Sequence, residues 1–193
     1  RRQRQMCIRD RIIAASKGLS YDQVLNQREV VTSRLRNKNF AMLDTNEHVD
    51  VYTGHGEFIS NKEIAITAGE DKIILSGETI IINTGAVAIK PNIDGIDTAT
   101  GFYNSTEIQQ LSPQPSTLGV IGAGPIGLEF ASLYAKLGTK VTVFNIESGI
   151  LKREESIVQE LANEYLTEQG ITILNDVTLN SVSNCLLYTS DAA

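Results

Sequence analysis

The sequence predicts an α/β protein with two unlike parts joined by a loop-rich connector, and three observations lead to this prediction. One long helical pattern is followed by short β-rich runs between residues 49 and 83, which is typical of a helix with a small antiparallel meander. Strands then alternate with helices from residue 118 to residue 174, which predicts a parallel sheet. Three of the four prolines lie near the edges of the connector, residues 91–115.

In the first part, a helix is predicted from Tyr21 to about Leu43, because apolar residues recur there at helical spacing, and Asp44-Thr45-Asn46 should end it. Four β-rich runs follow, separated by turn residues that include Gly54 and Gly56. The runs are Val49–Thr53, Glu63–Thr67, Lys72–Leu75 and Thr79–Asn83. We expect the last run, with Ile80-Ile81-Ile82, to be a buried strand.

The second part is predicted to be a parallel strand–helix–strand–helix–strand unit. The strands are expected at Leu118–Ile121, Lys140–Phe144 and Ile171–Leu174, and the helices at Pro125–Leu137 and Glu154–Gln169. Gly138 and Gly170 are the expected helix ends, because glycine tolerates the left-handed backbone that closes many helices.

Both ends of the chain read unlike protein termini. Cys185–Ala193 can be back-translated into DNA whose reverse complement, in another frame, encodes Gln3–Asp10 and ends the codon of Arg2. This is typical of a sequencing adapter that was ligated to both ends of a fragment and translated. We therefore interpret residues 1–11 and 185–193 as adapter-like artefacts and exclude them from fold reasoning.

Composition then narrows the classes of function. Cys7 and Cys185 both fall in the excluded tails, so residues 12–184 offer no thiol or disulfide, and we predict no metal site. The same residues hold 12 basic and 21 acidic side chains, a formal charge of −9. This acidic balance argues against nucleic acid or an anionic membrane as a partner.

The clearest functional motif is the turn Gly122-Ala123-Gly124-Pro125-Ile126-Gly127. It follows a predicted strand and opens a predicted helix, which is the context that dinucleotide binding requires. Gly122 would permit the tight turn, Gly124 would let the backbone approach a pyrophosphate, and Gly127 would let helix and strand pack closely. The helix N-terminus would offer free N–H groups to phosphate. A tight turn in an unrelated α/β protein is the alternative.

The residue that follows the second strand bears on which nicotinamide cofactor is used. An acidic residue is expected there to hold the ribose 2′-hydroxyl of NAD, but the chain has Asn145. Glu147 could serve that hydroxyl instead, whereas Lys152 or Arg153 could approach a 2′-phosphate. The sequence leaves NADH and NADPH open, and a solvated turn is the alternative for each of these charges taken singly.

The stretch GAGPIGLEFASLYAKLGTKVTVF resembles the NAD(P) module of the class I pyridine nucleotide–disulfide oxidoreductases, which include glutathione reductase and mercuric reductase. The resemblance implies that the chain contains the first half of a Rossmann-type NAD(P)-binding domain. It also implies that Glu129 points toward the nicotinamide and the flavin. Upstream, Ile80–Ala86 resembles a flavin signature of this family and would place Thr84 and Gly85 near FAD. Gly54, His55 and Gly56 match backbone positions near the FAD adenine.

The resemblance also implies the domain organisation and the reaction. Residues 12–90 would be the end of an FAD-binding domain, residues 91–115 a connector, and residues 116–184 the start of the NAD(P)-binding domain. SKGLSYDQVLNQREVVTSRLRNKNF and YNSTEIQQLSPQPSTLGVIGAG resemble a mercuric-reductase-like branch that acts on reactive chlorine species or hypothiocyanous acid. In this family a hydride passes from NAD(P)H to FAD and on to a redox disulfide.

No catalytic residue of the family maps onto this chain, since its C-x-x-x-x-C pair and its His–Glu pair match nothing in residues 12–184. The 193-residue polypeptide is therefore expected to be inactive by itself. The parent is expected to be a cytoplasmic homodimer that reduces a small-molecule or disulfide-type oxidant, with no nucleic acid or membrane partner. A flavin-free NAD(P)-dependent dehydrogenase and a non-catalytic redox-sensing module are the alternatives.

Overall fold

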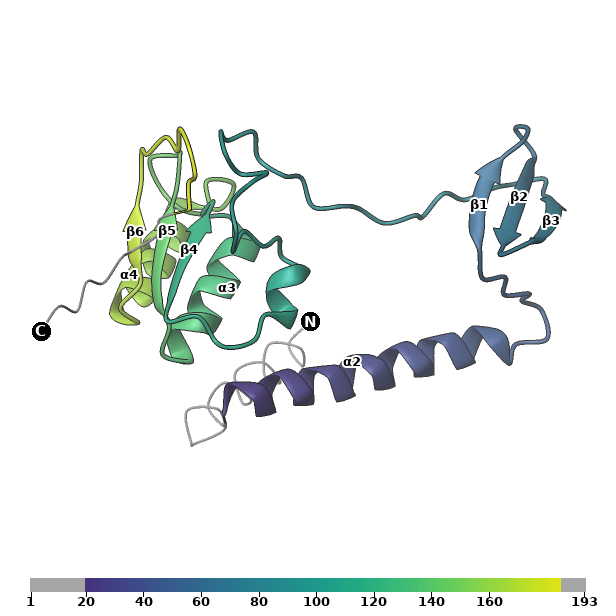
Figure 1. Cartoon of the computed structure of the whole chain (residues 1–193), viewed down its shortest axis with the longest axis horizontal. Helices are drawn as coiled ribbons and strands as arrows, with labels where there is room; N and C mark the ends of the chain where they lie inside the picture. Colours follow the sequence, from purple (N-terminus) through teal and green to yellow (C-terminus); the bar gives the residue numbers. More distant parts are fainter. Residues whose placement is uncertain (1–19, 185–193) are drawn as a thin grey trace, which may run out of the picture. The chain divides into compact units, whose positions relative to one another are not determined.

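The computed structural model describes residues 20–184, so the adapter-like tails predicted at residues 1–11 and 185–193 lie outside the described residues. The described residues form two compact units. One contains residues 20–27 and 88–184, and the other contains residues 28–87 (Figure 1). The parallel sheet belongs to the first unit and an antiparallel sheet belongs to the second.

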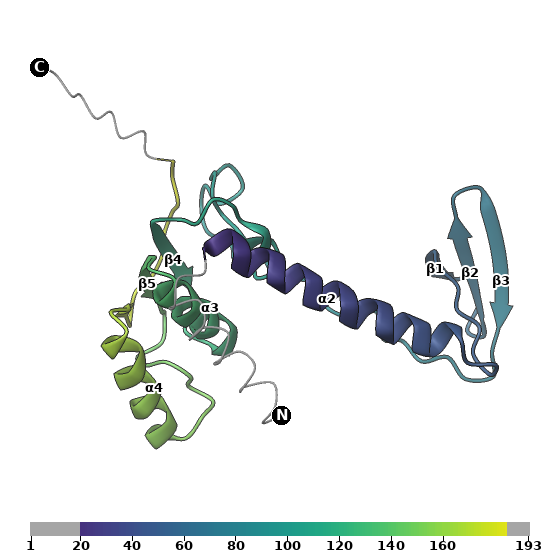
Figure 2. The ribbon, with the colours of Figure 1, turned by 90° about the horizontal axis from the view of Figure 1, so that it is seen from below.

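The parallel sheet has the strand order β4-β5-β6. Its strands are β4 (Thr117–Ile121), β5 (Lys140–Phe144) and β6 (Thr172–Leu174), and helices α3 (Pro125–Lys136) and α4 (Ser156–Glu168) connect them. Both strand pairings are parallel, and Figure 2 shows α3 and α4 beside the sheet. The predicted strand–helix–strand–helix–strand unit is confirmed, and its element ends lie within two residues of the predicted ones.

The core of this unit lies between α3 and the central strand. Alternate residues of β5 point inward, so Val141 and Val143 are almost fully buried, and they pack with Ala131 and Tyr134 of α3. Ile108 from the connector joins this core, and its carbonyl oxygen accepts a hydrogen bond of 2.9 Å from the Tyr134 hydroxyl. The connector is therefore packed against the sheet unit and carries a short 3₁₀ helix, η1 (Glu107–Gln110).

Glycines close both helices of the sheet unit, as predicted. Gly138 has a φ of 94° and follows α3, and Gly170 has a φ of 77° and follows α4. Each conformation lies in the left-handed region, where a side chain would be strained. These ends return the chain directly to β5 and β6.

The second unit contains the greater part of helix α2 (Tyr21–Asp44) and a three-stranded antiparallel sheet. The sheet has the order β1-β2-β3, formed by β1 (His55–Phe58), β2 (Glu63–Ala68) and β3 (Asp71–Ser76). The helix and the meander are both confirmed. Neither α2 nor another helix of the described residues is long and apolar enough to cross a membrane.

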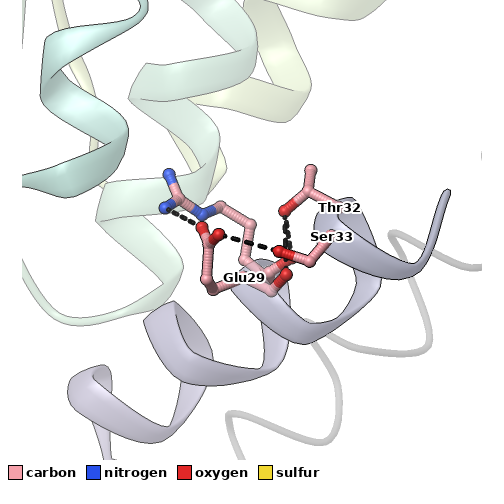
Figure 3. Close-up of polar contacts among 4 residues, drawn as sticks. Glu29, Thr32 and Ser33 are labelled. Carbon is pink, nitrogen blue, oxygen red and sulfur yellow. Dashed lines mark hydrogen bonds and ion pairs between the residues drawn. The ribbon is translucent and has the colours of Figure 1, made fainter. Parts of the chain in front are cut away.

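Polar contacts within α2 are local. The Thr32 hydroxyl donates to the Arg28 carbonyl oxygen at 2.6 Å, and the Ser33 hydroxyl donates to the Glu29 carboxylate at 3.0 Å (Figure 3). Arg28 and Glu29 also form an ion pair at 3.3 Å. No residue of α2 is fully buried, and Leu35 and Phe40 of its apolar pattern are about half exposed. The helical spacing thus predicted the helix correctly, although little in the described residues covers its apolar side chains.

The first predicted strand is wrong in position. Residues 49–53 have no regular structure, and β1 begins at His55, inside the segment that we expected to be a turn. Gly56 lies opposite Ile66 in the ladder. A Cβ on Gly54 would lie 2.7 Å from the carbonyl oxygen of Thr67, so Gly54 permits a close approach of the backbone to β2. Glycine here marks close packing between chain segments rather than a turn.

The predicted buried strand at Ile80–Ile82 is also wrong. Residues 80–89 form no strand in the described chain, and the side chains of Ile81 and Ile82 are 86% and 69% exposed. The physical reason is that no described strand pairs with this segment, so neither a hydrogen-bond ladder nor a packed face is available to it. The apolar pattern is that of a buried strand, but a strand needs a neighbour to exist.

Candidate functional site

A cleft of about 530 Å³ lies at the carboxyl ends of β4 and β5. One wall is the turn after β4, which contributes Ala123, Gly124 and Pro125, and the other is the loop after β5. The loop contributes Asn145, Glu147, Gly149, Leu151, Lys152, Arg153 and Glu154. In parallel α/β sheets, ligands bind outside the carboxyl ends of the strands, so this is the position expected of a binding site.

Each of the three glycines in the turn is needed for a different structural reason. Gly122 has a φ of 99°, and its N–H donates to the Phe144 carbonyl oxygen at 2.8 Å, which ties the turn to β5. A Cβ on Gly127 would collide with the carbonyl oxygen of Gly122, so only glycine allows α3 to approach the turn. A Cβ on Gly124 would meet nothing within 4 Å. The space before Gly124 is therefore open, as close approach of a ligand requires.

The N-terminus of α3 offers backbone donors to this open space. Gly124 is the N-cap and has no side chain to cap the helix, and Pro125 has no N–H. The first helical hydrogen bond runs from the Leu128 N–H to the Gly124 carbonyl oxygen at 3.1 Å. In the described part of the chain, the N–H groups of Ile126 and Gly127 have no protein acceptor. Two free donors at the positive end of a helix dipole suit a phosphate group.

Asn145 lies directly after β5 and is 4% exposed. Its side-chain nitrogen donates to the carbonyl oxygens of Glu147 and Gly149, each at 3.0 Å, and lies 2.9 Å from the Asn175 side-chain oxygen. Because backbone carbonyls only accept hydrogen bonds, they fix the NH₂ group on this side. The carboxamide oxygen, to which no described residue donates, is the group that Asn145 can offer a ligand.

The loop after β5 is held at several further points. The Leu151 N–H donates to the Ala123 carbonyl oxygen at 3.1 Å, which joins the two walls of the cleft. The Asp176 N–H donates to the Glu147 carbonyl oxygen at 3.1 Å. Leu151 has a φ of 49°, a left-handed conformation that costs a leucine free energy and persists only where the surroundings impose it. The loop is thus a built wall of the cleft.

The structure brings most of the predicted NAD(P) residues together. Gly124, Pro125, Asn145 and Glu147 line the cleft, and Gly122, Ile126 and Gly127 belong to the same turn and helix start. Sequence reasoning missed Gly149 and Leu151. Gly149 sits in an ordinary turn sequence and Leu151 is strained only in three dimensions, so neither carries a sequence signal.

Glu129 differs from its predicted surroundings. Its apolar neighbours made a solvated position less expected, but Glu129 is exposed on α3. The reason is helical geometry, because successive residues point about 100° apart, and Leu128 takes the buried position instead.

The predicted FAD residues lie in two separate segments of the described chain. His55 and Gly56 belong to β1, and Gly54 precedes it, whereas Thr84 and Gly85 lie in the irregular segment that follows Ile82. None of the five lines the cleft at the glycine turn. Gly85 has a φ of 79°, which agrees with a turn that needs glycine at this point.

Asn145→Ala is expected to loosen the loop. The change leaves two backbone carbonyls without their donor, so we expect the free energy of unfolding of the surrounding unit to fall by about 1–3 kcal/mol. Amide hydrogen exchange at Leu151 and Asp176 should accelerate in the full-length protein. Asn163→Ala is the matched control, because Asn163 is exposed on α4, and it should change stability by less than about 0.5 kcal/mol. Unchanged exchange at both amides would show that the hydrogen bonds of Asn145 do not hold the loop.

Comparison with known proteins gives a consistent result. The profile of the family described as "Pyridine nucleotide-disulphide oxidoreductase" matches residues 3–185. The probable pyridine nucleotide-disulfide oxidoreductase RclA of Escherichia coli (strain K12) is 35% identical over 170 residues, which cover 88% of this chain and 38% of that protein. A mercuric reductase of Bacillus cereus is 27% identical over 159 residues, which cover 82% of this chain and 24% of the relative.

A solved structure agrees with these similarities. The Cu(II) complex of the HOCl-induced flavoprotein disulfide reductase RclA from Escherichia coli matches with a TM-score of 0.83 at 34% identity. The match covers 90% of this chain and 40% of that chain, so this sequence spans about two fifths of the solved protein. The motifs predicted a resemblance to flavoprotein disulfide reductases of the mercuric-reductase-like and reactive-chlorine branch, and these similarities confirm it.

Proposed function

The chain belongs to the pyridine nucleotide-disulphide oxidoreductase family, and we propose that it is part of a reductase that uses NAD(P)H and FAD. In such a reductase NAD(P)H supplies a hydride, FAD accepts it, and a redox disulfide carries the electrons to an oxidant. The cysteines of this redox disulfide have no counterpart in residues 12–184, so another part of the reductase would supply them. The observation that carries the proposal is the cleft at the glycine turn, with its open space before Gly124 and its two acceptor-free amides.

The residues around this cleft fit a dinucleotide. The pyrophosphate would lie before Gly122 and Gly124 and accept hydrogen bonds from the N–H groups of Ile126 and Gly127. The adenosine ribose would then face the end of β5, where Asn145 and Glu147 line the cleft. Glu129 would lie toward the nicotinamide. Its exposure is compatible with this role, because the group would meet a ligand rather than the protein core.

We propose that two segments of this chain contribute to the FAD site. Thr84 and Gly85 would lie beside FAD, and the backbone of Gly54, His55 and Gly56 would lie near its adenine. The exposed apolar run through Ile81 and Ile82 supports this proposal, because it is a strand-like segment without a partner among the described residues.

Oxidant defence is the proposed role of the whole protein. The support is similarity to a disulfide reductase that is described as HOCl-induced and to mercuric reductases, whose name states mercuric ion as the substrate. We propose a small-molecule or disulfide-type oxidant as the substrate, a homodimer as the assembly and the cytoplasm as the location. A segment beyond residues 12–184 would supply the dimer contact and the acid–base residues.

The test uses the full-length protein. We expect it to purify with bound flavin and to oxidise NAD(P)H when hypothiocyanous acid, an N-chloramine or a disulfide is added, followed by the loss of NAD(P)H absorbance. The 193-residue polypeptide should show no such turnover and serves as the comparison. Full-length protein that holds no flavin and transfers electrons to none of these acceptors would overturn the proposal in favour of a flavin-free dehydrogenase or a binding module.

A further inference from the structure

Two tyrosine hydroxyls lie together where the start of α2 contacts α3. The Tyr21 hydroxyl donates a hydrogen bond of 2.7 Å to the Leu111 carbonyl oxygen, and the Tyr134 hydroxyl donates one of 2.9 Å to the Ile108 carbonyl oxygen. The two hydroxyl oxygens are 3.0 Å apart, and the two ring centroids are 6.2 Å apart. This pair of tyrosines therefore joins α2, the connector and α3 to one another.

Helix α2 is more buried in its first turns than in its second half. Tyr21, Val24 and Leu25 are half-buried, and the Tyr21 side chain packs against the apolar core of the sheet unit. From residue 34 onward every residue of α2 is exposed. The hydroxyl of Tyr21, the first residue of the helix, ends on a carbonyl oxygen that lies 90 residues further along the chain. The start of α2 is therefore anchored by long-range contacts, and these gather at one tyrosine.

The described chain passes between its two units at two places, and α2 is one of them. Residues up to 27 belong to the sheet unit, whereas residues 28–44 of the same helix belong to the second unit, which also holds the segment 54–56 that we propose near FAD. The other passage lies in residues 80–89, which have no regular structure. A helix is a semi-rigid connection and an irregular segment is not. The anchored helix is therefore the passage that can fix how the chain leaves the sheet unit.

Tyr134 lies on the helix that also carries the proposed pyrophosphate site. Helix α3 begins at the glycine turn with the N–H groups of Ile126 and Gly127, and it carries Glu129 on its exposed side. The Tyr134 side chain is 3% exposed and belongs to the same core cluster as Val143 of β5. Since α3 is fixed in the core through this residue, the tyrosine pair connects the start of α2 to the helix of the cofactor site.

We propose that Tyr21 and Tyr134 are positioning residues of the reductase, which hold the start of α2 on α3 and the connector so that NAD(P)H bound at the glycine turn can reduce the flavin. Neither tyrosine lines the cleft at that turn, so the pair acts through the helices that it joins. This inference rests on the proposed function, because it presupposes both cofactors. A misplacement of about 1 Å can slow a reaction by on the order of 100-fold, so a contact far from the cofactors can limit the rate of transfer without changing affinity.

The experiment uses Tyr21→Phe in the full-length protein, because phenylalanine keeps the ring and removes only the hydroxyl. The first readout needs no cofactor: amide hydrogen exchange at Val24 and Leu111, whose N–H groups donate to the carbonyl oxygens of Ser20 and Ile108. We expect exchange at both amides to accelerate by about fivefold, since one hydrogen bond stabilises a local structure by a factor of this order.

The second readout is the rate of flavin reduction by NAD(P)H, followed by stopped-flow absorbance in the absence of oxygen. At saturating NAD(P)H we expect Tyr21→Phe to lower this rate by at least about tenfold. The NAD(P)H concentration that gives half of the maximal rate should stay within about twofold, because the cleft itself is unchanged. A variant that was only less well folded would lose bound flavin or NAD(P)H affinity instead.

Two further variants complete the test. Tyr165→Phe is the matched control, because Tyr165 is an exposed tyrosine of the same unit whose hydroxyl accepts a hydrogen bond from Lys136, and it should change neither readout. The double variant Tyr21→Phe/Tyr134→Phe should reduce its flavin about as slowly as the slower single variant, since both changes break one contact, whereas the effects of independent sites would multiply.

The outcomes separate the positioning role from the proposed function. Unchanged exchange at Val24 and Leu111 would overturn the pair as the anchor of α2. Faster exchange with an unchanged rate of flavin reduction would overturn the positioning role and leave the reductase standing, and so would a loss of bound flavin in Tyr21→Phe. If the unmodified protein holds no flavin, or if NAD(P)H does not reduce it, the proposed function fails and the positioning role fails with it.

Discussion

Gly127→Val is expected to lower the free energy of unfolding of the sheet unit by about 3 kcal/mol, at the upper end of the usual range for overpacking. A Cβ at this position would collide with the carbonyl oxygen of Gly122 and lie 3.2 Å from a methyl carbon of Val120. The collision is with backbone, which cannot turn aside as a flexible side chain can. Replacing a glycine inside a helix stabilises the helix by less than about 1 kcal/mol. The steric clash is larger, so the net change in the free energy of unfolding is a loss.

The measurement for Gly127→Val is the thermal transition of the full-length protein, followed by circular dichroism. Gly124→Ala is its matched control, because it adds a Cβ in the same turn where nothing lies within 4 Å and the φ is −80°. We expect the control to stay within about 0.5 kcal/mol of the unmodified protein. Equal stability of the two variants would show that α3 can move away from the turn at no cost.

The sheet unit could be predicted from the sequence because its local signals agree with one another. An apolar strand, a glycine turn, an amphipathic helix and a closing glycine follow in order, and each supports the same parallel arrangement. Gly122, Gly138 and Gly170 all have positive φ, as their places in this pattern demand. The pairing of β4 with β5 agrees with the tendency of consecutive strands with a short connection to lie side by side.

The second unit was less predictable because strands depend on partners that the local sequence does not specify. Val49–Thr53 has four β-forming residues but no regular structure, whereas His55–Phe58 has three fewer of them and pairs with β2. Gly54 and Gly56 read as turn residues, yet Gly56 pairs with Ile66, and Gly54 lies just before the strand, where a Cβ would collide with the Thr67 carbonyl oxygen. β-propensity expresses fit to a neighbouring surface, and the neighbour is not visible in sequence.

The candidate site also has a part that could be predicted from the sequence and a part that could not. Its glycines were predictable, since each has a fixed geometric task at a fixed spacing. The orientation of Asn145 was not predictable, because it depends on the carbonyls of Glu147 and Gly149, which only the folded loop brings to it. A sequence shows that the residue is not acidic. Only the structure shows that an acid would oppose two carbonyl oxygens there.

Gly124→Val is expected to weaken dinucleotide binding by about 100-fold or more while the protein stays folded. The side chain would fill the open space before the turn, where nothing now lies within 4 Å of a Cβ. A pyrophosphate kept away from this space would lose its bonds to the N–H groups of Ile126 and Gly127. Each charge-assisted bond contributes about 1.5–3 kcal/mol, so the loss of two corresponds to at least about 100-fold in affinity.

The measurement for Gly124→Val pairs calorimetric titration of the nicotinamide dinucleotide with the thermal transition of the same sample. Because the φ of −80° at Gly124 suits any residue, we expect the transition to shift little, unlike that of Gly127→Val. The two variants thus separate the two tasks of the turn: Gly124 keeps space for a ligand, and Gly127 keeps the helix against the strand. Tight binding by a folded Gly124→Val protein would mean that the pyrophosphate does not lie at this helix N-terminus, and the site would have to be sought elsewhere.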